Sequence, residues 1–331
     1  MTTRATWLAG AVGVAALAVL PWMSPASYFL HIVILILLWS FIYTAWALMG
    51  KFGLVSLGHG AFLGIGAYTS ALLWNFFALT PWLGIPIGMV LAVLLAIVIG
   101  YPCFRLKVVG HYFALVTLAL AEVARLSIVA ARDITGGSLG MTPAGVPTPS
   151  WVALQFADKR YFYFLALGVW LFGLWVWRRM DASMASAALE AISEDEGAAA
   201  AIGIHVTRHK LYLTIVSAGL TAFGGALYGQ FVMYLNPDTL AGVGVSLQIV
   251  FAAIAGGMYS MLGPTVGAVL TIVLGEALRV WFGTTWIGAA NTIYGILLVI
   301  FIIYMPRGIV GLLTSHLRAA KLRIGGVPLK S

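Results

Sequence analysis

The chain has 331 residues, of which 62% are hydrophobic and only 8% are Asp, Glu, Lys or Arg, whereas a soluble domain has about 25% charged residues. So few charges cannot cover a soluble body of 35.3 kDa with a mean hydropathy of +1.03. The composition therefore excludes a soluble enzyme, a disordered chain and a nucleic-acid-binding module, and it predicts an all-α polytopic membrane protein. The net charge of +8 then reflects basic residues held in cytoplasmic loops.

Apolar windows of about 20 residues, the length that crosses a bilayer core, predict about ten (8–10) transmembrane helices. The windows cover residues 7–23, 28–49, 58–78, 82–104, 111–131, 161–177, 211–234, 246–261, 264–282 and 291–313. Glycine and other small residues dominate the third and eighth windows. Each of these two is predicted to be either a regular span or a broken or re-entrant helix, which is tolerated only where protein or a water-filled cavity satisfies its backbone.

The first window has two interpretations. Arg4, the apolar run 7–20 and the small residues of 24–27 resemble a signal peptide. The sequence Pro-Trp-Met at 21–23 fits a cleavage region poorly, which favours a retained helix.

Loop charges predict the orientation of the spans. With the N-terminus inside, the inner segments collect most of the basic residues, among them Arg4, Lys51, Arg105, Lys107, Arg178, Arg179, Arg208, Lys210, Arg307, Arg318, Lys321, Arg323 and Lys330. The outer segments hold Arg132, Lys159 and Arg160. Because basic residues resist translocation, both termini are predicted to be cytoplasmic.

Two segments between predicted spans are long. Residues 132–160 face outward and are rich in Gly and Pro, which predicts a turn-rich cap loop. Residues 178–210 face inward. Neither is long enough for a core of its own, so residues 1–331 are predicted to form a single transmembrane domain. The motif GxxxxGK[ST] is absent from the sequence, which predicts no ATPase site in this chain.

The inward segment 178–210 carries half of the acidic residues of the chain: Asp181, Glu190, Glu194, Asp195 and Glu196. Its Ala-rich, Glu-rich composition favours helix, and Gly203 stands where such a helix would end. We predict one or two short helices near the membrane surface. This segment either is a solvated loop or forms a docking helix for a cytosolic partner. In a docking helix, small residues such as Ala198 and Ala199 would allow close approach of the partner, and the acidic residues would set the register of the contact.

Charged residues also occur inside two predicted spans. Glu122 and Arg125 are spaced i, i+3, as are Glu276 and Arg279, so each pair shares a helix face and can neutralise itself. Each pair is either part of a translocation path or a buried structural pair. A proton relay is disfavoured, because an adjacent Arg stabilises the ionised carboxylate. The same Glu-x-x-Arg pair in the fifth and the ninth predicted spans suggests that the two halves of the chain are related.

A glycine-rich block surrounds Ser56 and His59 at the start of the third span. Its glycines are Gly53, Gly58, Gly60, Gly64 and Gly66. Small residues let helices pack closely in lipid, and that alone would explain them. An unwound stretch that presents its backbone to a substrate path is the second interpretation. Ser56 and His59 are therefore candidates for the path.

Several blocks together resemble the bacterial permeases for branched-chain amino acids of the LivH/LivM type. They are Gly53–Tyr68 (GLVSLGHGAFLGIGAY), Tyr112–Glu122 (YFALVTLALAE), Thr135–Gly140 (TGGSLG), Glu194–Ile204 (EDEGAAAAIGI), Thr207–Leu211 (TRHKL), Ser217–Tyr228 (SAGLTAFGGALY), Gly256–Pro264 (GGMYSMLGP) and Pro306–Gly308. The resemblance covers about residues 28–313. The second and third blocks point to the LivM half, and Thr135, Gly136 and Gly137 join the path candidates.

The resemblance implies the permease subunit of an ABC importer in the bacterial inner membrane. Its partners would be a second, LivH-like permease subunit, two cytosolic ATPase subunits that bind the ATP, and a periplasmic amino-acid-binding protein; the chain itself would need no cofactor. The family's coupling motif, Glu-x-Ala-Ala with a Gly seven residues after the Glu, is matched by Glu196, Ala198, Ala199 and Gly203. Gly197 departs from the family's larger residue and predicts a looser helix start.

Other functions remain open from the sequence. One is a stand-alone ion-coupled secondary transporter for a small solute, with Glu122 and Glu276 as its titratable groups. Another is an ABC permease for urea, amides or aromatic acids. A membrane enzyme is disfavoured, because the sequence has neither HExxH nor GxSxG and its histidines are scattered, so no catalytic or metal-binding residues are predicted.

Overall fold

The computed structural model describes residues 3–23, 27–108, 110–282, 292–293, 295–297, 300 and 308–312. This part of the chain is a helical bundle without strands, in which two isolated β-bridges join Met141 to Leu235 and Ser150 to Gln155. Its long helices are α1 (Thr3–Met23), α2 (Ser27–Gly50), α3 (His59–Phe77), α4 (Pro81–Arg105), α5 (His111–Ala130), α7 (Lys159–Asp181), α10 (Val206–Val232), α12 (Val243–Gly256) and α13 (Gly263–Phe282). Short helices complete it: α6 (Arg132–Thr135), η1 (Gly137–Leu139), α8 (Met184–Glu194), α9 (Glu196–Ala201) and α11 (Pro237–Leu240).

The predicted all-α membrane fold is confirmed. Seven segments of the described chain are long and apolar enough to cross a membrane: α2, α4, α5, α7, α10, α13 and the combined stretch Pro237–Gly256. Each of the first nine predicted windows coincides with a helix or with most of one. Most of the tenth, residues 291–313, lies outside the described residues. The predicted number of spans and the side on which the termini lie stay predictions.

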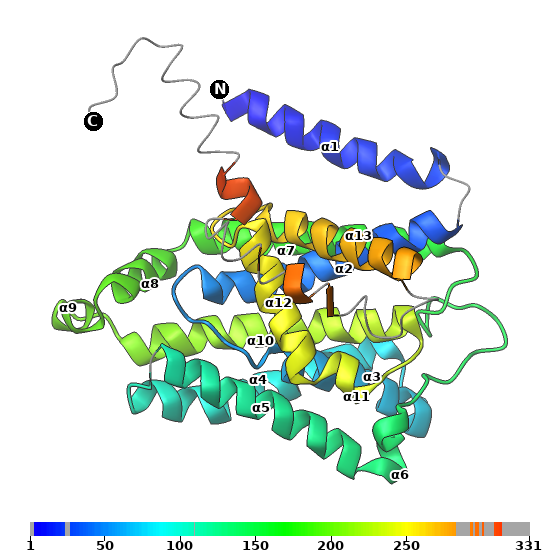
Figure 1. Cartoon of the computed structure of the whole chain (residues 1–331), viewed down its shortest axis with the longest axis horizontal. Coiled ribbons are helices and arrows are strands. Elements are labelled where there is room, and N and C mark those ends of the chain that lie inside the picture. The colour runs from blue at the N-terminus through cyan, green and yellow to red at the C-terminus, as the bar shows by residue number, and fades with distance from the viewer. Residues whose placement is uncertain are drawn as a thin grey trace.

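Helix α2 forms the centre of the bundle, between α7, α10 and α13 (Figure 1). Its sequence is apolar on every side, as expected of a helix surrounded by protein, and 78% of its most apolar window is buried. In α5 and α13 only 22% of that window is buried. These two helices therefore present most of their surface to lipid or to another subunit.

The third window is one continuous helix, α3, and the eighth is helical as far as Gly256, but a non-helical interruption precedes each of these two helices. Residues 51–58 are not helical before α3 begins at His59, although Leu54, Ser56 and Gly58 are buried. The second interruption separates α11 from α12 at Ala241 and Gly242. A Cβ on Gly60 would lie 3.0 Å from the carbonyl oxygen of Ala241, so the two interruptions meet inside the bundle. Protein surrounds both, as irregular backbone at this depth requires.

Candidate functional site

The acidic segment forms the helical hairpin of α8 and α9 at one end of the bundle (Figure 1). Two short helices were among the predicted outcomes, and the structure confirms them. Leu189 and Ile192 are 1% and 4% exposed and fix α8 to the bundle. Glu190 and Glu194 are exposed and line a groove of about 740 Å³ between α8 and the end of α7. Their position is suited to a partner outside the bundle.

Asp195 and Glu196 have intramolecular roles that the sequence analysis did not foresee. The Oδ1 atom of Asp195 accepts hydrogen bonds from the backbone N–H groups of Gly197 and Ala198 at 2.7 and 2.9 Å. Asp195 is thus the N-cap of α9, and the looser start expected from Gly197 is countered by this cap. Glu196 forms an ion pair with Lys210 of α10, whose side chain is 7% exposed. Both acids hold the hairpin together and tie it to α10.

Gly203 ends α9 in the way its sequence position predicted. Its φ is +92°, its N–H donates to Ala200 O at 3.0 Å, and the N–H of Ile204 donates to Ala199 O at 3.1 Å. This pair of bonds is the Schellman motif, in which glycine occupies the left-handed position without steric cost. Ala199 is buried and Ala198 is exposed, so the two alanines of the coupling motif face different sides.

Replacing Gly203 by Ala is expected to loosen α9. The left-handed conformation costs a residue with a Cβ about 1–2 kcal/mol, which corresponds to at least about fivefold faster opening of the last turn. Amide hydrogen exchange of α9 in the detergent-solubilised protein measures this. Gly145→Ala is the control, because its φ is not positive and no atom lies within 4 Å of the added Cβ. Equal exchange in both variants would refute a role for Gly203 in stopping the helix.

His59 is fully buried inside the bundle. Its Nε2 lies 2.8 Å from Ser217 Oγ, and Ser217 Oγ donates to Ala45 O at 2.6 Å. Because the serine proton is used in that bond, His59 Nε2 must carry a proton and donate to Ser217. Nδ1 is then an acceptor, and it has no partner among the described residues. His59 thereby links α3 to α10, and through Ser217 to α2.

Ser56 lies in the non-helical stretch 51–58, and its neighbours satisfy the backbone there. Trp46 Nε1 donates to Ser56 O at 2.8 Å, Thr117 Oγ1 accepts from Leu57 N at 2.9 Å, and Ser56 Oγ accepts from Gly58 N at 3.2 Å. Residues 51–58 are thus unwound, but whether they face a substrate path stays a prediction, whereas the close contacts at Gly60, Gly64 and Gly66 agree with the packing interpretation for the glycines of α3. Thr117 is a polar partner that the sequence analysis missed.

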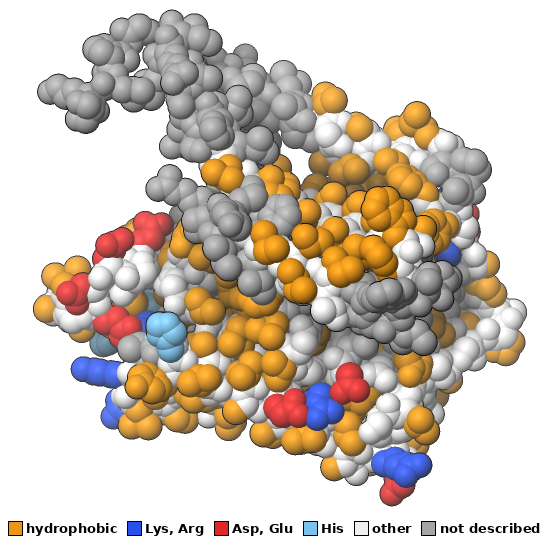
Figure 2. Space-filling view, viewed as in Figure 1, with side chains coloured by type: hydrophobic (Ala, Val, Ile, Leu, Met, Phe, Trp, Pro, Cys, Tyr) orange, Lys and Arg blue, Asp and Glu red, His pale blue; other side chains and the backbone are white. Residues whose placement is uncertain are grey.

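Glu122 and Arg125 form the predicted pair on α5 and share it with a third residue. Arg125 Nε donates to both carboxylate oxygens of Glu122 at 3.1 Å, and Nη1 donates to Asp238 of α11 at 3.0 Å. The side chains of Glu122 and Asp238 are 39% and 65% exposed. Figure 2 shows a small group of acidic and basic side chains over α5 and α11 within a largely hydrophobic face. Asp238 was missed because it lies 113 residues from its partner.

Glu276 and Arg279 also form the predicted ion pair, on α13. Tyr28 of α2 donates its hydroxyl hydrogen to Glu276, which ties the two helices together. The side chain of Arg279 is 69% exposed. This pair and the Glu122–Arg125 pair thus lie on different helices and have different third partners.

Thr135, Gly136 and Gly137 form a turn between α6 and η1. Thr135 Oγ1 donates to Ile128 O at 2.6 Å and accepts from Gly137 N at 3.2 Å. A Cβ on Gly140, which follows η1, would overlap the carbonyl oxygen of Leu235. The turn joins the end of α5 to the end of α10, and its polar groups bind one another.

The path candidates therefore lie in four places and not around one cavity. Three cavities, of about 890, 740 and 290 Å³, lie near helix ends, and none of the path candidates lines them. Of the coupling candidates, Glu190 and Glu194 line the second cavity, and Glu196 and Gly203 line the first. Within the described ranges no three His, Cys, Asp or Glu residues are placed to hold a metal ion.

Comparison with known proteins supports the resemblance in the sequence. The family model described as "Branched-chain amino acid transport system / permease component" matches residues 28–305. The LivM permease protein of the high-affinity branched-chain amino acid transport system of Salmonella typhimurium is 28% identical over 293 residues, which cover 82% of this chain and 67% of LivM. The corresponding LivH protein of Escherichia coli is 24% identical over 275 residues, 79% of this chain and 87% of LivH. No solved structure matches the chain.

The family match and the seven apolar helices identify a multi-pass membrane protein, which in bacteria lies in the inner membrane. The match covers most of the chain and all of the long helices that surround α2. The chain therefore belongs to the permease components of branched-chain amino acid transport systems and is of the LivM type.

Proposed function

We propose that this chain is one of two permease subunits of an ABC importer for branched-chain or related hydrophobic amino acids. The family match over residues 28–305 carries the proposal. The partners are a LivH-like permease, two cytosolic ATPases and a periplasmic binding protein. The chain binds no ATP itself; the ATPases move the bundle between outward-open and inward-open states.

In this proposal residues 1–331 form one domain of about ten spans with both termini in the cytoplasm. Residues 132–160 are the outer cap, and residues 178–210 are the cytoplasmic coupling loop. The helices α8 and α9 support the assignment of residues 178–210 as the coupling loop. Glu190 and Glu194 face outward, while Leu189 and Ile192 anchor the hairpin to the bundle. A rigid, anchored hairpin transmits a displacement from a partner to the helices behind it.

The ion pairs within the spans favour an ATP-driven permease over a proton-coupled transporter. Glu122 accepts hydrogen bonds from Arg125, and Glu276 is bound by Arg279 and Tyr28. An Arg bound this closely stabilises the charged form of the carboxylate and so disfavours its use as a proton carrier. Neither glutamate is suited to be the coupling group of a stand-alone carrier.

Reconstitution in proteoliposomes tests the proposal. With a LivH-like permease, both ATPases and a binding protein, we expect leucine uptake that requires ATP and stops when any one component is omitted. An uncoupler is expected to leave the rate unchanged. Uptake by this chain alone that is abolished by an uncoupler and insensitive to ATP would refute the proposal and establish the secondary transporter instead.

A further inference from the structure

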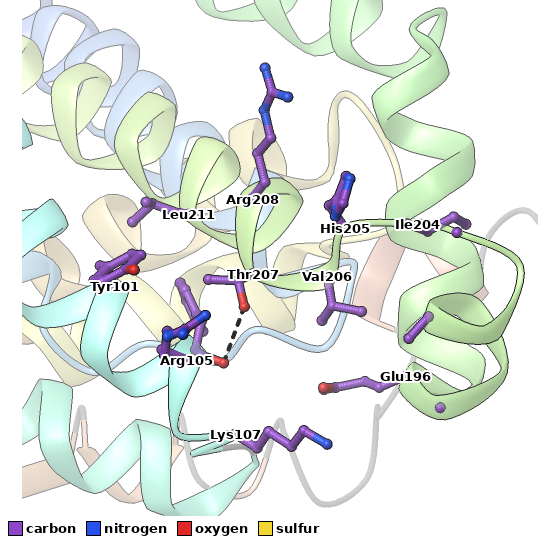
Figure 3. Close-up of a pocket in the computed structure, with 14 residues that line it drawn as sticks. Tyr101, Arg105, Lys107, Glu196, Ile204, His205, Val206, Thr207, Arg208 and Leu211 are labelled. Carbon is purple, nitrogen blue, oxygen red and sulfur yellow. Dashed lines mark hydrogen bonds between the residues drawn. The ribbon is translucent and has the colours of Figure 1, made fainter.

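The largest of the three cavities lies where two membrane-spanning helices end. It has a volume of about 890 Å³ and opens between the last turn of α4, which ends at Arg105, and the first turn of α10, which begins at Val206. A hydrogen bond of 3.4 Å from Thr207 Oγ1 to Phe104 O joins the two helices behind it (Figure 3). Because both helices are long and apolar enough to cross a membrane and the cavity lies at their ends, we infer that it lies at the depth of the lipid headgroups.

Basic side chains surround the cavity without acidic partners. Arg105, Lys107 and Arg208 line it and are exposed, and within the described chain none of the three forms an ion pair. Glu196 also lines the cavity, but its charge is balanced by Lys210. The rim therefore carries three uncompensated positive charges.

Lys107 occupies a conformation that a lysine adopts at a cost. Its φ is +55°, and the bonds from Lys107 N to Phe104 O and from Val108 N to Cys103 O close the end of α4 as a Schellman motif. Glycine is the usual residue at this position. A lysine here directs a positive charge to the cavity at the expense of local backbone strain.

An apolar surface leads from the membrane to this basic rim. Leu94, Val98 and Tyr101 are 52%, 64% and 47% exposed and follow one another at i, i+4 and i+7 on one face of α4. Tyr101, Phe104 and Leu211 continue this surface into the lining of the cavity. The surface thus combines an apolar track about two helical turns long with a cationic end, which matches part of an acyl chain joined to an anionic headgroup.

We propose that this cavity binds an anionic phospholipid, with its headgroup at the basic rim that Arg105, Lys107 and Arg208 form and an acyl chain along α4. In Figure 3, Arg105 and Lys107 lie on one side of the opening, and the guanidinium of Arg208 points away from them. Three cations spread around a rim do not converge on one small anion, so a free phosphate gains little here, whereas a lipid is also held by its chain. The bound lipid bridges α4 and the connection between α9 and α10.

The acidic face of the hairpin distinguishes this cavity from the proposed ATPase contact. Figure 2 shows acidic side chains over α8 and α9, whereas basic ones lie beside them over the neighbouring end of α4. The acidic residues at 190 and 194 line a different groove. The lipid site thus adjoins the coupling loop, since Glu196 and Gly203 also line it, but it is a different groove from the one that Glu190 and Glu194 line.

Native mass spectrometry of the full chain titrated with dioleoylphosphatidylglycerol tests the proposal, with dioleoylphosphatidylcholine as the neutral lipid. We expect the anionic lipid to bind at least tenfold more tightly. The triple variant Arg105→Gln, Lys107→Gln, Arg208→Gln is expected to lose about fivefold in affinity for each charge removed. A control variant removes the same charge at the opposite end of the bundle, by Arg132→Gln, Lys159→Gln and Arg160→Gln. Its affinity for the anionic lipid is expected to change less than twofold.

Three results would overturn the proposal. The first two are an equal loss of lipid affinity in the control variant and an unchanged lipid affinity in the triple variant. The third is complete displacement of the lipid by millimolar inorganic phosphate, which would mean that the site binds a free anion. A second measurement on the unmodified chain is independent of how the variants fold. A photoactivatable phosphatidylglycerol is expected to crosslink to peptides that contain residues 94–107 or 205–211. Crosslinks found only elsewhere would equally reject the site.

Discussion

The double variant Glu190→Lys, Glu194→Lys is expected to abolish ATP-driven uptake in the reconstituted importer. Both carboxylates are exposed, lie one helical turn apart on α8 and line the same groove. Reversing two charges at a complementary contact places like charges against the partner, which lowers affinity by about a hundredfold or more. We expect the ATPases to be lost from the complex on size-exclusion chromatography, while the bundle stays folded because neither side chain is part of its core.

Asp133→Lys is the matched control for this experiment. Asp133 is exposed at the opposite end of the bundle, on α6, and its reversal is expected to leave ATPase association unchanged. The proposed coupling role of α8 fails if the double variant retains both ATPase association and uptake. Loss of association in the Asp133 variant as well would indicate a general effect of charge and not a contact made by α8.

Glu196 is the less informative position for such a test, although it matches the family's coupling motif. Its carboxylate is paired with the buried Lys210, so Glu196→Lys would set two cations against each other and disturb the hairpin before any partner binds. Exchanging the charges, Glu196→Lys with Lys210→Glu, separates the two effects. The motif spacing singles out this loop in the sequence, but only the structure shows which of its acids face outward.

Local patterns in the sequence predicted most of the helices and several of their ends. Apolar windows located α2, α4, α5 and α7 because each span must be apolar over its own length, and the i, i+3 spacing predicted both ion pairs within spans. Gly203 marked the end of α9 for a similarly local reason. These are features that a few neighbouring residues determine by themselves.

Contacts between distant segments could not be predicted from the sequence. Asp238 binds Arg125, and Ser217 joins His59 to Ala45, because the bundle brings together helices that are far apart in the chain. For the same reason the path candidates did not meet in one cavity. Each was chosen for its own chemistry, whereas a path is formed by whichever faces the helices turn toward one another or toward a second subunit.

Helices α3 and α10 approach each other closely, and glycine makes this contact possible. A Cβ on Gly66 would lie 2.6 and 2.7 Å from the backbone C and Cα atoms of Ala222 and closer still to its carbonyl oxygen. One turn away, a Cβ on Gly225 would overlap the backbone of Leu63. The obstacle at both positions is helix backbone, which cannot change rotamer to make room, so an added methyl group must push the two helices apart.

Gly66→Ala is therefore expected to destabilise the protein by about 1–3 kcal/mol, the usual cost of overpacking, even though alanine favours helix more than glycine does. Thermal unfolding in detergent measures the change, together with the fraction that elutes as a monodisperse peak. Gly168→Ala on α7 is the control: nothing lies within 4 Å of its added Cβ, so the gain in helix propensity should leave its stability unchanged or slightly raised.

The double variant Gly66→Ala, Gly225→Ala is expected to lose less stability than the sum of the losses in the two single variants, because one displacement of α3 from α10 relieves both overlaps. If Gly66→Ala unfolds at the same temperature as Gly168→Ala, the helices are not held at this distance, and the glycines of α3 require an explanation other than packing.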